Sequence, residues 1–238
     1  MTLIDADPGD IPAFLDRRPF VGTYSNLKAF INCEYAMNRR YIKKDLPFVP
    51  TEATEFGNAA HAAMEARVGK GKVLPEHFRQ WEKYATPFDK FEVKCEQKLG
   101  ITSNAKAVGY WDNLVWIRGV ADNTIIQNDK ALLTDWKCTS SGSRFEDVFE
   151  LEMHALLLKA HFPQLNKISG RFVYLKQEEL GRLYDLSNFT KTWNEINRLM
   201  TLVQEKRQSG EWAKKKSGLC GWCDCSECEN HFVSEKRK

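Results

Sequence analysis

The alternation of apolar and polar residues predicts two strands joined by a tight turn near the middle of the chain. Residues 119–127 and 130–137 are both rich in β-branched and apolar residues, and Asn128 and Asp129 stand between them. Asn and Asp side chains tolerate the positive φ angles that a two-residue hairpin turn requires. We therefore expect a β-hairpin whose loop consists of these two residues.

This hairpin is expected to bring acidic side chains together. With a two-residue loop Gln127 pairs with Lys130, and the same register places Asp122 opposite Asp135. Carboxylates about 5 Å apart on adjacent strands repel each other, and Lys137 projects from the same face as Asp135. A divalent cation would offset the repulsion and activate a water molecule. The alternative is an ordinary Asp and Lys on a solvated face, and a one-residue shift in register would separate the two carboxylates.

Helical periodicity and strand-like alternation occur on both sides of the hairpin. Helices are predicted at residues 25–44, 54–68, 75–88, 146–161 and 186–208, and further strands at residues 91–99, 114–118 and 168–176. This order indicates an α/β fold in which helices flank a mixed central β-sheet, and not a doubly wound nucleotide-binding fold. The chain has no glycine-rich phosphate loop of either common pattern, so the use of ATP is unsupported.

Polar residues spaced one helical turn apart mark two of these helices. Gly57, His61 and Glu65 follow one another at intervals of four and share one helical face. Glu150 and His154 have the same spacing in a later helix. Helical histidines are often structural, and an acidic residue near a helix start also interacts with the helix dipole. These residues are therefore candidates for a site, with a structural role as the alternative.

Four cysteines lie within nine residues near the C-terminus, Cys220, Cys223, Cys225 and Cys228. Thiolates this close need a cation to offset their repulsion, and an odd total of seven cysteines favours metal binding in a reducing compartment over disulfides. Two Cys-x-x-Cys pairs suit zinc, although the single residue between the pairs makes one tetrahedral site awkward. An iron–sulfur cluster would instead recruit Cys33, which is otherwise expected to be a small buried residue inside the first helix.

Composition adds limits on size, location and charge. A chain of 238 residues with 42% hydrophobic and 28% charged residues is typical of one globular domain or of a domain with a small appendage. We expect a Pro- and Asp-rich lead-in at residues 1–23 and a single domain at 24–238, divided into a helical part (24–90), a sheet core (91–185) and a helix with the cysteine cluster (186–238). No membrane span and no secretory signal are visible, which favours the cytoplasm.

The net charge of +3 means that any affinity for nucleic acid must come from local patches. Two such patches are the polar side of the first helix and a run near the C-terminus. Each is equally a solvated surface or a contact for phosphate groups. Their basic residues are Lys28, Arg39, Arg40, Lys43 and Lys44, and Lys214-Lys215-Lys216.

Taken in order, these motifs resemble those of the PD-(D/E)xK nuclease superfamily, and most closely the RecB-type exonucleases, which include CRISPR-adaptation nucleases and phage-encoded relatives. The resemblance covers most of residues 24–231. The motifs that carry it are Gly57-x3-His61-x3-Glu65, similar to the family's histidine motif, Gly119-Val-Ala-Asp122, similar to its acidic strand, and Asp135-Trp-Lys137, similar to its signature triplet.

The resemblance implies a restriction-endonuclease-like core and assigns roles to these residues. Mg²⁺ or Mn²⁺ would be bound by His61, Asp122, Asp135 and the backbone carbonyl of Trp136, while Lys137 would orient the attacking water and stabilise charge on the phosphate. The family's Gln-x3-Tyr motif, which supports the site and contacts the substrate, corresponds here to Glu150 and His154, so this chain departs from the pattern.

Members of the family with an iron–sulfur cluster use one cysteine from the first helix and three near the C-terminus. The corresponding residues are Cys33, Cys220, Cys223 and Cys228, so the resemblance implies a [4Fe–4S] cluster that clasps the two chain ends. Cys225 falls outside this pattern, and its role as a ligand is open. Structural Zn²⁺ is the alternative.

The function implied is that of a metal-dependent deoxyribonuclease, an exonuclease acting on single-stranded DNA ends in recombination or repair. The expected location is the cytoplasm of a bacterium or a phage-infected host. Two alternatives remain: a non-catalytic nucleic-acid-binding protein that contains zinc or an iron–sulfur cluster, and an accessory subunit of a recombination or repair complex. DNA is the expected partner, together with a helicase, recombinase or integrase in the accessory role.

Overall fold

The computed structural model describes residues 19–46 and 49–232. Most of the lead-in expected at residues 1–23 therefore lies outside the described residues. The chain divides into two compact units, a terminal unit of Met1–Val49 and Ile196–Lys238 and a sheet unit of Pro50–Glu195. None of the helices in the described ranges is both long enough and apolar enough to cross a membrane.

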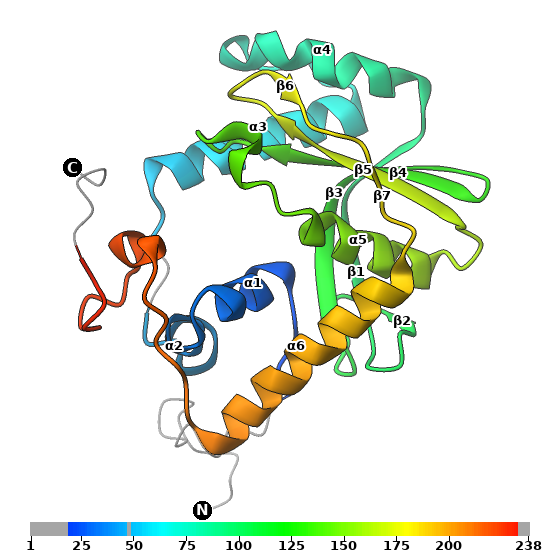
Figure 1. Ribbon diagram of the computed structural model, residues 1–238. Helices are drawn as coiled ribbons and strands as arrows, with labels where there is room; N and C mark the ends of the chain where they lie inside the picture. The colour runs from blue at the N-terminus through cyan, green and yellow to red at the C-terminus, as the bar shows by residue number, and fades with distance from the viewer. Residues whose placement is uncertain (1–18, 47–48, 233–238) are drawn as a thin grey trace, which may run out of the picture. The chain divides into compact units, whose positions relative to one another are not determined.

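The sheet unit is built on a seven-stranded mixed sheet (Figure 1). The strand order is β2-β1-β3-β4-β5-β6, and β7 also pairs with β5. Strands β4 and β5 are parallel, and the other neighbouring pairs are antiparallel. The strands are β1 (Val93–Ile101), β2 (Ala107–Val108), β3 (Ile117–Gln127), β4 (Lys130–Lys137), β5 (Lys167–Tyr174), β6 (Glu179–Leu180) and β7 (Tyr184–Asp185).

The central hairpin has the predicted two-residue turn. Gln127 pairs with Lys130, and Asn128 has a φ angle of 56°, in the left-handed region that asparagine tolerates. Residues 114–118 do not form a separate strand, because β3 already begins at Ile117 and continues into the hairpin. The ladder between β3 and β4 ends at the residue after Asp122, so the two strands separate where the acidic residues begin.

Helices cover both faces of the sheet, which confirms the predicted mixed α/β sheet flanked by helices. On one face Trp136 and Val173 belong to a core cluster with residues of α3 and the short helices that follow it. On the other face the Lys137 ammonium lies 5.1 Å from the centre of the Phe172 ring and donates to Glu150 of α5. The helices are α3 (Glu52–Lys70), the 3-10 helix η3 (Glu76–Trp81), α4 (Glu82–Ala85), the 3-10 helices η4 (Thr86–Lys90) and η5 (Gly142–Phe145), and α5 (Val148–His161).

Gly119 of β3 allows close packing of α5 on the sheet. A Cβ atom there would lie 2.8 Å from His154 Cδ2 and 3.0 Å from Leu157 Cδ1. We expect Gly119→Ala to lower the free energy of unfolding by about 1–3 kcal/mol through overpacking. Gly57→Ala is the matched control: nothing lies within 4 Å of the added atom, and alanine should stabilise α3 by up to about 1 kcal/mol. Urea denaturation followed by circular dichroism measures both, and equal losses of stability would contradict the close packing.

The terminal unit contains α1 (Tyr24–Asn32), α2 (Glu34–Met37), the π-helix η2 (Asn38–Lys43) and the 3-10 helix η6 (Gly218–Trp222). Helix α6 (Phe189–Ser209) begins in the sheet unit and ends in the terminal unit. Its bounds are close to those predicted from its periodicity.

The prediction of one continuous helix over residues 25–44, with Cys33 inside it, is wrong. Cys33 is extended, with φ −164° and ψ 112°, and separates α1 from α2. The reason is a long-range contact. The Tyr35 N–H donates to the Ala213 carbonyl at 3.1 Å, and the Ala213 N–H donates to Glu34 Oε2 at 3.1 Å. The C-terminal segment thus takes over hydrogen bonding that an unbroken helix would have made internally.

Candidate metal centre

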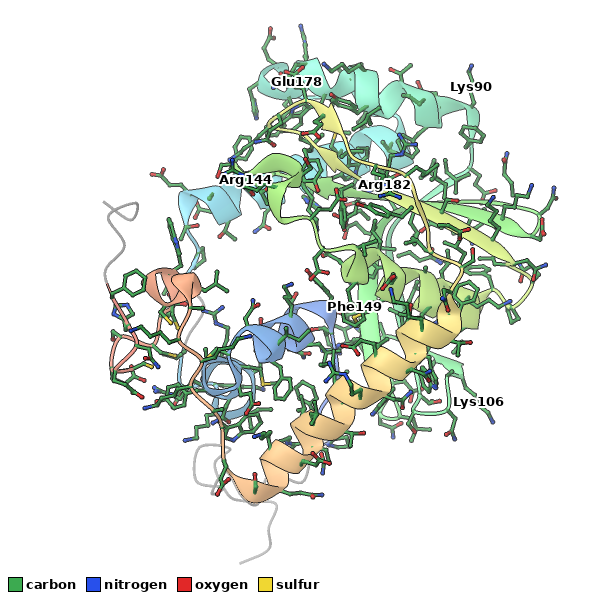
Figure 2. All side chains as sticks on the ribbon, in the orientation of Figure 1. Lys90, Lys106, Arg144, Phe149, Glu178 and Arg182 are labelled. Carbon is green, nitrogen blue, oxygen red and sulfur yellow. The ribbon has the colours of Figure 1, made fainter. Side chains whose placement is uncertain are left out.

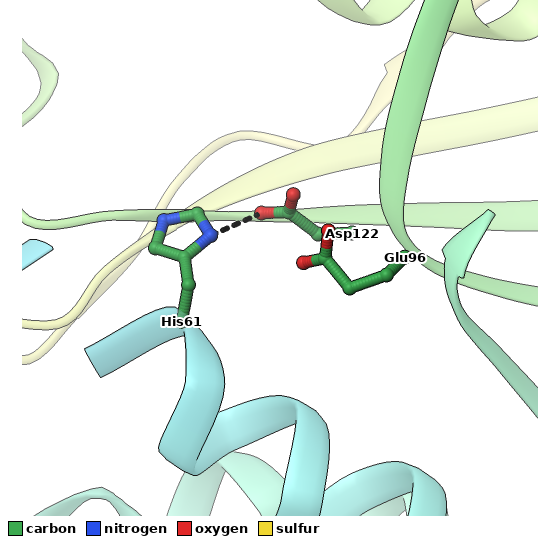
Figure 3. A group of neighbouring side chains, drawn as sticks. All are labelled: His61, Glu96 and Asp122. Atoms are coloured by element: carbon green, nitrogen blue, oxygen red, sulfur yellow. Dashed lines mark ion pairs between the residues drawn. The ribbon is translucent and has the colours of Figure 1, made fainter. Parts of the chain in front are cut away.

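Three potential metal ligands converge in the sheet unit, His61 from α3, Glu96 from β1 and Asp122 from β3 (Figure 3). One donor atom from each lies within 4.8 Å of the others, and His61 Nδ1 is 3.4 Å from Asp122 Oδ2. An imidazole nitrogen with carboxylate oxygens is a donor set that binds divalent cations such as Mn²⁺. The three side chains can therefore hold one such ion.

Strand register explains why Glu96 meets Asp122. The residues on either side of Glu96 pair with those on either side of Asp122, so the two acidic residues stand opposite each other on β1 and β3. Glu96 has a φ angle of 49°, an unusual backbone conformation for a residue in a strand. Opposed like charges destabilise a sheet, and a bound cation would remove that repulsion.

The two carboxyl groups resist ionisation in the absence of a cation. Burial, and then the charge of Asp135, raise the pKa of Asp122 well above its usual value, and a hydrogen bond from the Trp136 N–H to Asp122 Oδ2 at 2.8 Å opposes this only in part. Burial, and then the charge of Glu65, raise the pKa of Glu96. Protons and a metal ion therefore compete for the same oxygens, so metal affinity should rise with pH.

His61 is held in the neutral form that binds metals. Burial lowers its pKa, although the charge of Asp135 and a hydrogen bond with the Trp136 backbone act in the opposite direction. The contact between His61 and Asp122 is therefore not a charged pair at neutral pH. The backbone of Trp136, predicted to provide a carbonyl ligand, lies next to this histidine.

Asp135 and Lys137 form a neighbouring group. Lys137 Nζ lies 2.8 Å from Asp135 Oδ2 and donates to Glu150 Oε2 at 2.7 Å. Asp135 is 5% exposed, and within the described ranges its Oδ2 has this ion pair but no hydrogen bond of good geometry. Burial alone would lower the pKa of Lys137, but the charges of Asp135 and Glu150 together raise it. The ammonium group therefore stays protonated.

The acidic residue that faces Asp122 is not the predicted Asp135. Asp122 faces Glu96 across β1 and β3, and Asp135 is not among the three residues whose donor atoms lie within 4.8 Å of one another. The charges of Asp122 and Asp135 still interact, because Asp135 contributes to the raised pKa of Asp122.

Glu65 and His154 occupy different surroundings. Glu65 lines the same hollow as the three converging ligands and pairs with Lys70 at 2.8 Å. His154 is 8% exposed and packs against Gly119, and burial lowers its pKa to about 4. A neutral histidine in this position fills the interface between α5 and β3.

An open hollow of about 700 Å³ gives access to this centre. Its walls include His61, Glu96, Asp122 and Lys137, and Gly57 leaves its rim free of a side chain. The hollow falls within the size range of typical ligand sites. A substrate can therefore reach the three converging ligands and the ammonium group of Lys137 from one side.

Glu96 was not anticipated from the sequence. Its signal is an acidic residue in the middle of a half-buried strand. Such a residue can be assigned to the site only when β1 is known to pair with β3, because the register of that pair places Glu96 opposite Asp122.

Glu150 should make the stability of the metal-free protein depend on pH. Burial, and then the charge of Asp135, raise its pKa to about 7. A carboxyl whose pKa is raised by folding stabilises the fold at low pH, and this contribution is lost as the pH rises toward about 7. Glu150→Gln should therefore flatten the decline in stability between about pH 5 and pH 8. Urea denaturation in EDTA over that range is the measurement, and an unaltered decline would argue against this role.

A second hollow, of about 220 Å³, lies in the terminal unit. Its lining includes Cys33, Cys220, Cys223, Cys225 and Cys228, so the expected meeting of Cys33 with the C-terminal cysteines occurs. None of the seven cysteines, all of which lie within the described residues, is in a disulfide. Cys225 is 1% exposed, and burial, followed by the charge of Cys223, raises its pKa to about 12.

Basic residues of the first helices and of the C-terminal lysine run form ion pairs inside the terminal unit. Lys215 also donates to the Ile31 carbonyl at 3.1 Å. The positive charges proposed as DNA contacts are thus partly compensated, and they hold the cysteine-bearing segment against the first helices. The ion pairs are Arg39–Asp45, Arg39–Glu227, Arg40–Asp224 and Lys214–Glu229.

Comparison with known proteins supports the fold. No family model and no curated protein sequence matches the chain. Among solved structures, the chain is similar to a protein from Eubacterium rectale designated as a candidate exonuclease, with 10% identity and a TM-score of 0.55 over 99% of this chain and 95% of that one. It is also similar to the protein SSO0001, with 14% identity and a TM-score of 0.53 over 90% of this chain and 87% of that one. At these identities the similarity shows that this chain shares the mixed α/β fold of the candidate exonuclease.

Proposed function

We propose that this protein is a divalent-metal-dependent nuclease of the PD-(D/E)xK superfamily that hydrolyses DNA. The main support is the convergence of His61, Glu96 and Asp122 beside Lys137 in one open hollow. The fold shared with the candidate exonuclease is consistent with this activity. The proposed mode is exonucleolytic, on single-stranded ends.

In this proposal His61, Glu96 and Asp122 bind the cation. Asp135 and the Trp136 carbonyl are the further ligands that the resemblance implies. The charge of Asp135 and a hydrogen bond with the Trp136 backbone both raise the pKa of His61. When bound, Mg²⁺ or Mn²⁺ would lower the pKa of water and neutralise charge on the phosphate. A further group is needed to position the phosphate and to stabilise the negative charge that develops on it.

Lys137 has that role. Its ammonium group would donate to a non-bridging phosphate oxygen as negative charge develops there. Asp135 and Glu150 hold the ammonium group on either side and keep it protonated. In the reaction a water oxygen bonds to phosphorus and the water gives up a proton to solvent. The bond from phosphorus to the departing sugar oxygen breaks, and that oxygen takes up a proton.

End-labelled oligonucleotides test the activity. Single-stranded and duplex DNA, each with free or blocked ends, would be incubated with Mg²⁺, Mn²⁺ or EDTA. We expect metal-dependent release of nucleotides from free single-stranded ends and protection by blocked ends. Glu96→Gln should abolish most of the activity, while Glu92→Gln, at an exposed position just before β1, should not. Absence of cleavage with every substrate and metal would reject the proposal.

We also propose that Cys33, Cys220, Cys223 and Cys228 hold an iron–sulfur cluster. Cys33 and the three C-terminal cysteines line one hollow of the terminal unit, and one distant and three clustered cysteines are a ligand arrangement that an iron–sulfur cluster accepts. Cys225, whose pKa is raised, would remain a protonated thiol.

Metal analysis of protein purified without oxygen tests this second proposal. Brown colour with iron and acid-labile sulfide is the expected result, and Cys33→Ser should reduce all three. Cys225→Ser is the matched control and should retain them. A colourless protein that contains zinc would reject the cluster.

A further inference from the structure

The segment between β2 and β3 and the start of β3 together form an exposed aromatic surface, here called the aromatic platform. It consists of Tyr110 and Trp111 of that segment and Arg118 of β3. Trp111 is 74% exposed. The Tyr110 and Trp111 rings are 4.8 Å apart and inclined at 80°. The Arg118 guanidinium lies 4.6 Å from the centre of the Tyr110 ring and 4.5 Å from that of Trp111. A tryptophan this exposed contributes little to the core, so its place on the surface suggests a ligand.

Three hydrogen bonds brace this segment. The Asp112 N–H donates to the Gly109 carbonyl at 3.0 Å, and the Leu114 N–H donates to Asp112 Oδ1 at 2.7 Å. Arg118 Nη1 donates to the Tyr110 carbonyl at 3.3 Å. The rings are thus presented on a fixed support, and a ligand that stacks on them would order few additional groups.

The platform also carries positive charge that the fold does not neutralise. Among the residues that the structure describes, Arg118 forms no ion pair, and its buried Nε atom has no hydrogen-bond partner. Arg67, by contrast, pairs with both Glu82 and Asp89. Lys106, in the turn before β2, extends into solvent (Figure 2). Exposed rings beside the Arg118 guanidinium are complementary to flat bases on an anionic backbone.

Strand β3 connects the platform to the metal centre. Arg118 and Asp122 lie four residues apart on β3, which corresponds to about 13 Å at about 3.3 Å per residue. A strand of DNA whose terminal phosphodiester lay at the metal centre would cover this distance with a few nucleotides. Platform and metal centre can therefore engage the same strand.

We propose that the aromatic platform binds an unstacked base of single-stranded nucleic acid, with the Trp111 indole against the base and Arg118 beside a neighbouring phosphate. This inference rests on the proposed nuclease function and specifies its substrate. In a duplex both faces of each base are covered by neighbouring bases, so the platform selects single strands. Tyr, Trp and Arg are also frequent in protein interfaces, so binding of a single strand has to be distinguished from binding of a protein.

Binding is measured apart from hydrolysis, by fluorescence anisotropy of a labelled oligothymidine with the full chain in EDTA. Trp111→Ala should weaken binding by about 5- to 150-fold, the loss expected for one stacked base. Trp111→Phe, which keeps a ring, should retain most of the affinity. The matched control is Leu114→Ala, which removes a side chain that is 68% exposed in the same segment and should leave the affinity unchanged. Affinity for a duplex should not respond to Trp111→Ala.

Equal affinity of the wild type and Trp111→Ala for the single strand would overturn the proposal. It would also be overturned if the wild type self-associates, Trp111→Ala prevents this and DNA binding is unaltered, because the platform would then be a protein interface. Failure of the nuclease function gives a different result. A chain that binds single strands through Trp111 but cleaves no DNA with any metal would support the platform and reject the nuclease.

Discussion

Lys137→Ala is expected to reduce metal-dependent DNA hydrolysis by about 100- to 1,000-fold. This is the loss typical for removal of one donor to the charge that develops in the transition state. Lys137 is the cation beside the three converging ligands, and Asp135 and Glu150 keep it charged. Because the donor acts mainly as the charge develops, the loss should appear in kcat, with a small change in KM. Initial rates on a labelled single strand at several DNA concentrations measure both.

Lys130→Ala is the matched control for that experiment. It removes an exposed lysine from the other end of the same strand, β4. Its rates should equal those of the wild type. If Lys137→Ala retained wild-type kcat, the role assigned to this lysine would be wrong. Lys137→Arg should recover only part of the rate, since a planar guanidinium cannot reproduce the position of the ammonium group.

Asp122→Asn is expected to stabilise the metal-free protein against unfolding and to abolish its stabilisation by Mn²⁺. Burial and the charge of Asp135 raise the pKa of Asp122. Stability from this group is therefore present at low pH and is lost as the pH rises through its raised pKa. Asparagine removes the charge and keeps an oxygen that can accept the Trp136 N–H. We expect the melting temperature in EDTA at about pH 8 to rise by about 2–6 °C, and stabilisation by Mn²⁺ to disappear.

Thermal denaturation followed by circular dichroism, with EDTA or Mn²⁺, measures this change. Asp129→Asn is the control, because Asp129 lies exposed in the hairpin turn, and it should keep the full response to Mn²⁺. A metal-free Asp122→Asn protein less stable than the wild type at about pH 8 would show that the ionised carboxylate is not a source of repulsion.

The parts of the fold that were predictable depend on local chemistry. The turn at Asn128 and Asp129 follows from the conformations these side chains tolerate, and it fixed the pairing of Gln127 with Lys130. Helix α3 and the position of His61 on it follow from periodicity within a single segment. The mixed sheet likewise follows from the order of strands and helices.

The parts that were not predictable depend on contacts between distant residues. Glu96 belongs with Asp122 only because β1 pairs with β3. The break at Cys33 depends on hydrogen bonds with Ala213, far away along the chain. Apolar periodicity contains no information on either contact. For the same reason the sequence did not distinguish Trp111, which is exposed, from the buried Trp136.

The interruption at Cys33 has a consequence for biosynthesis. The hydrogen bonds at this interruption are made with Ala213. Ala213 leaves the ribosome only after the whole of Pro50–Glu195 has been made. The sheet unit is continuous in sequence and can fold during translation. The first helices, in contrast, must wait for the last part of the chain. A nascent chain stalled when residue 195 has just emerged from the exit tunnel should therefore display a protease-resistant sheet preceded by first helices that are still open to cleavage.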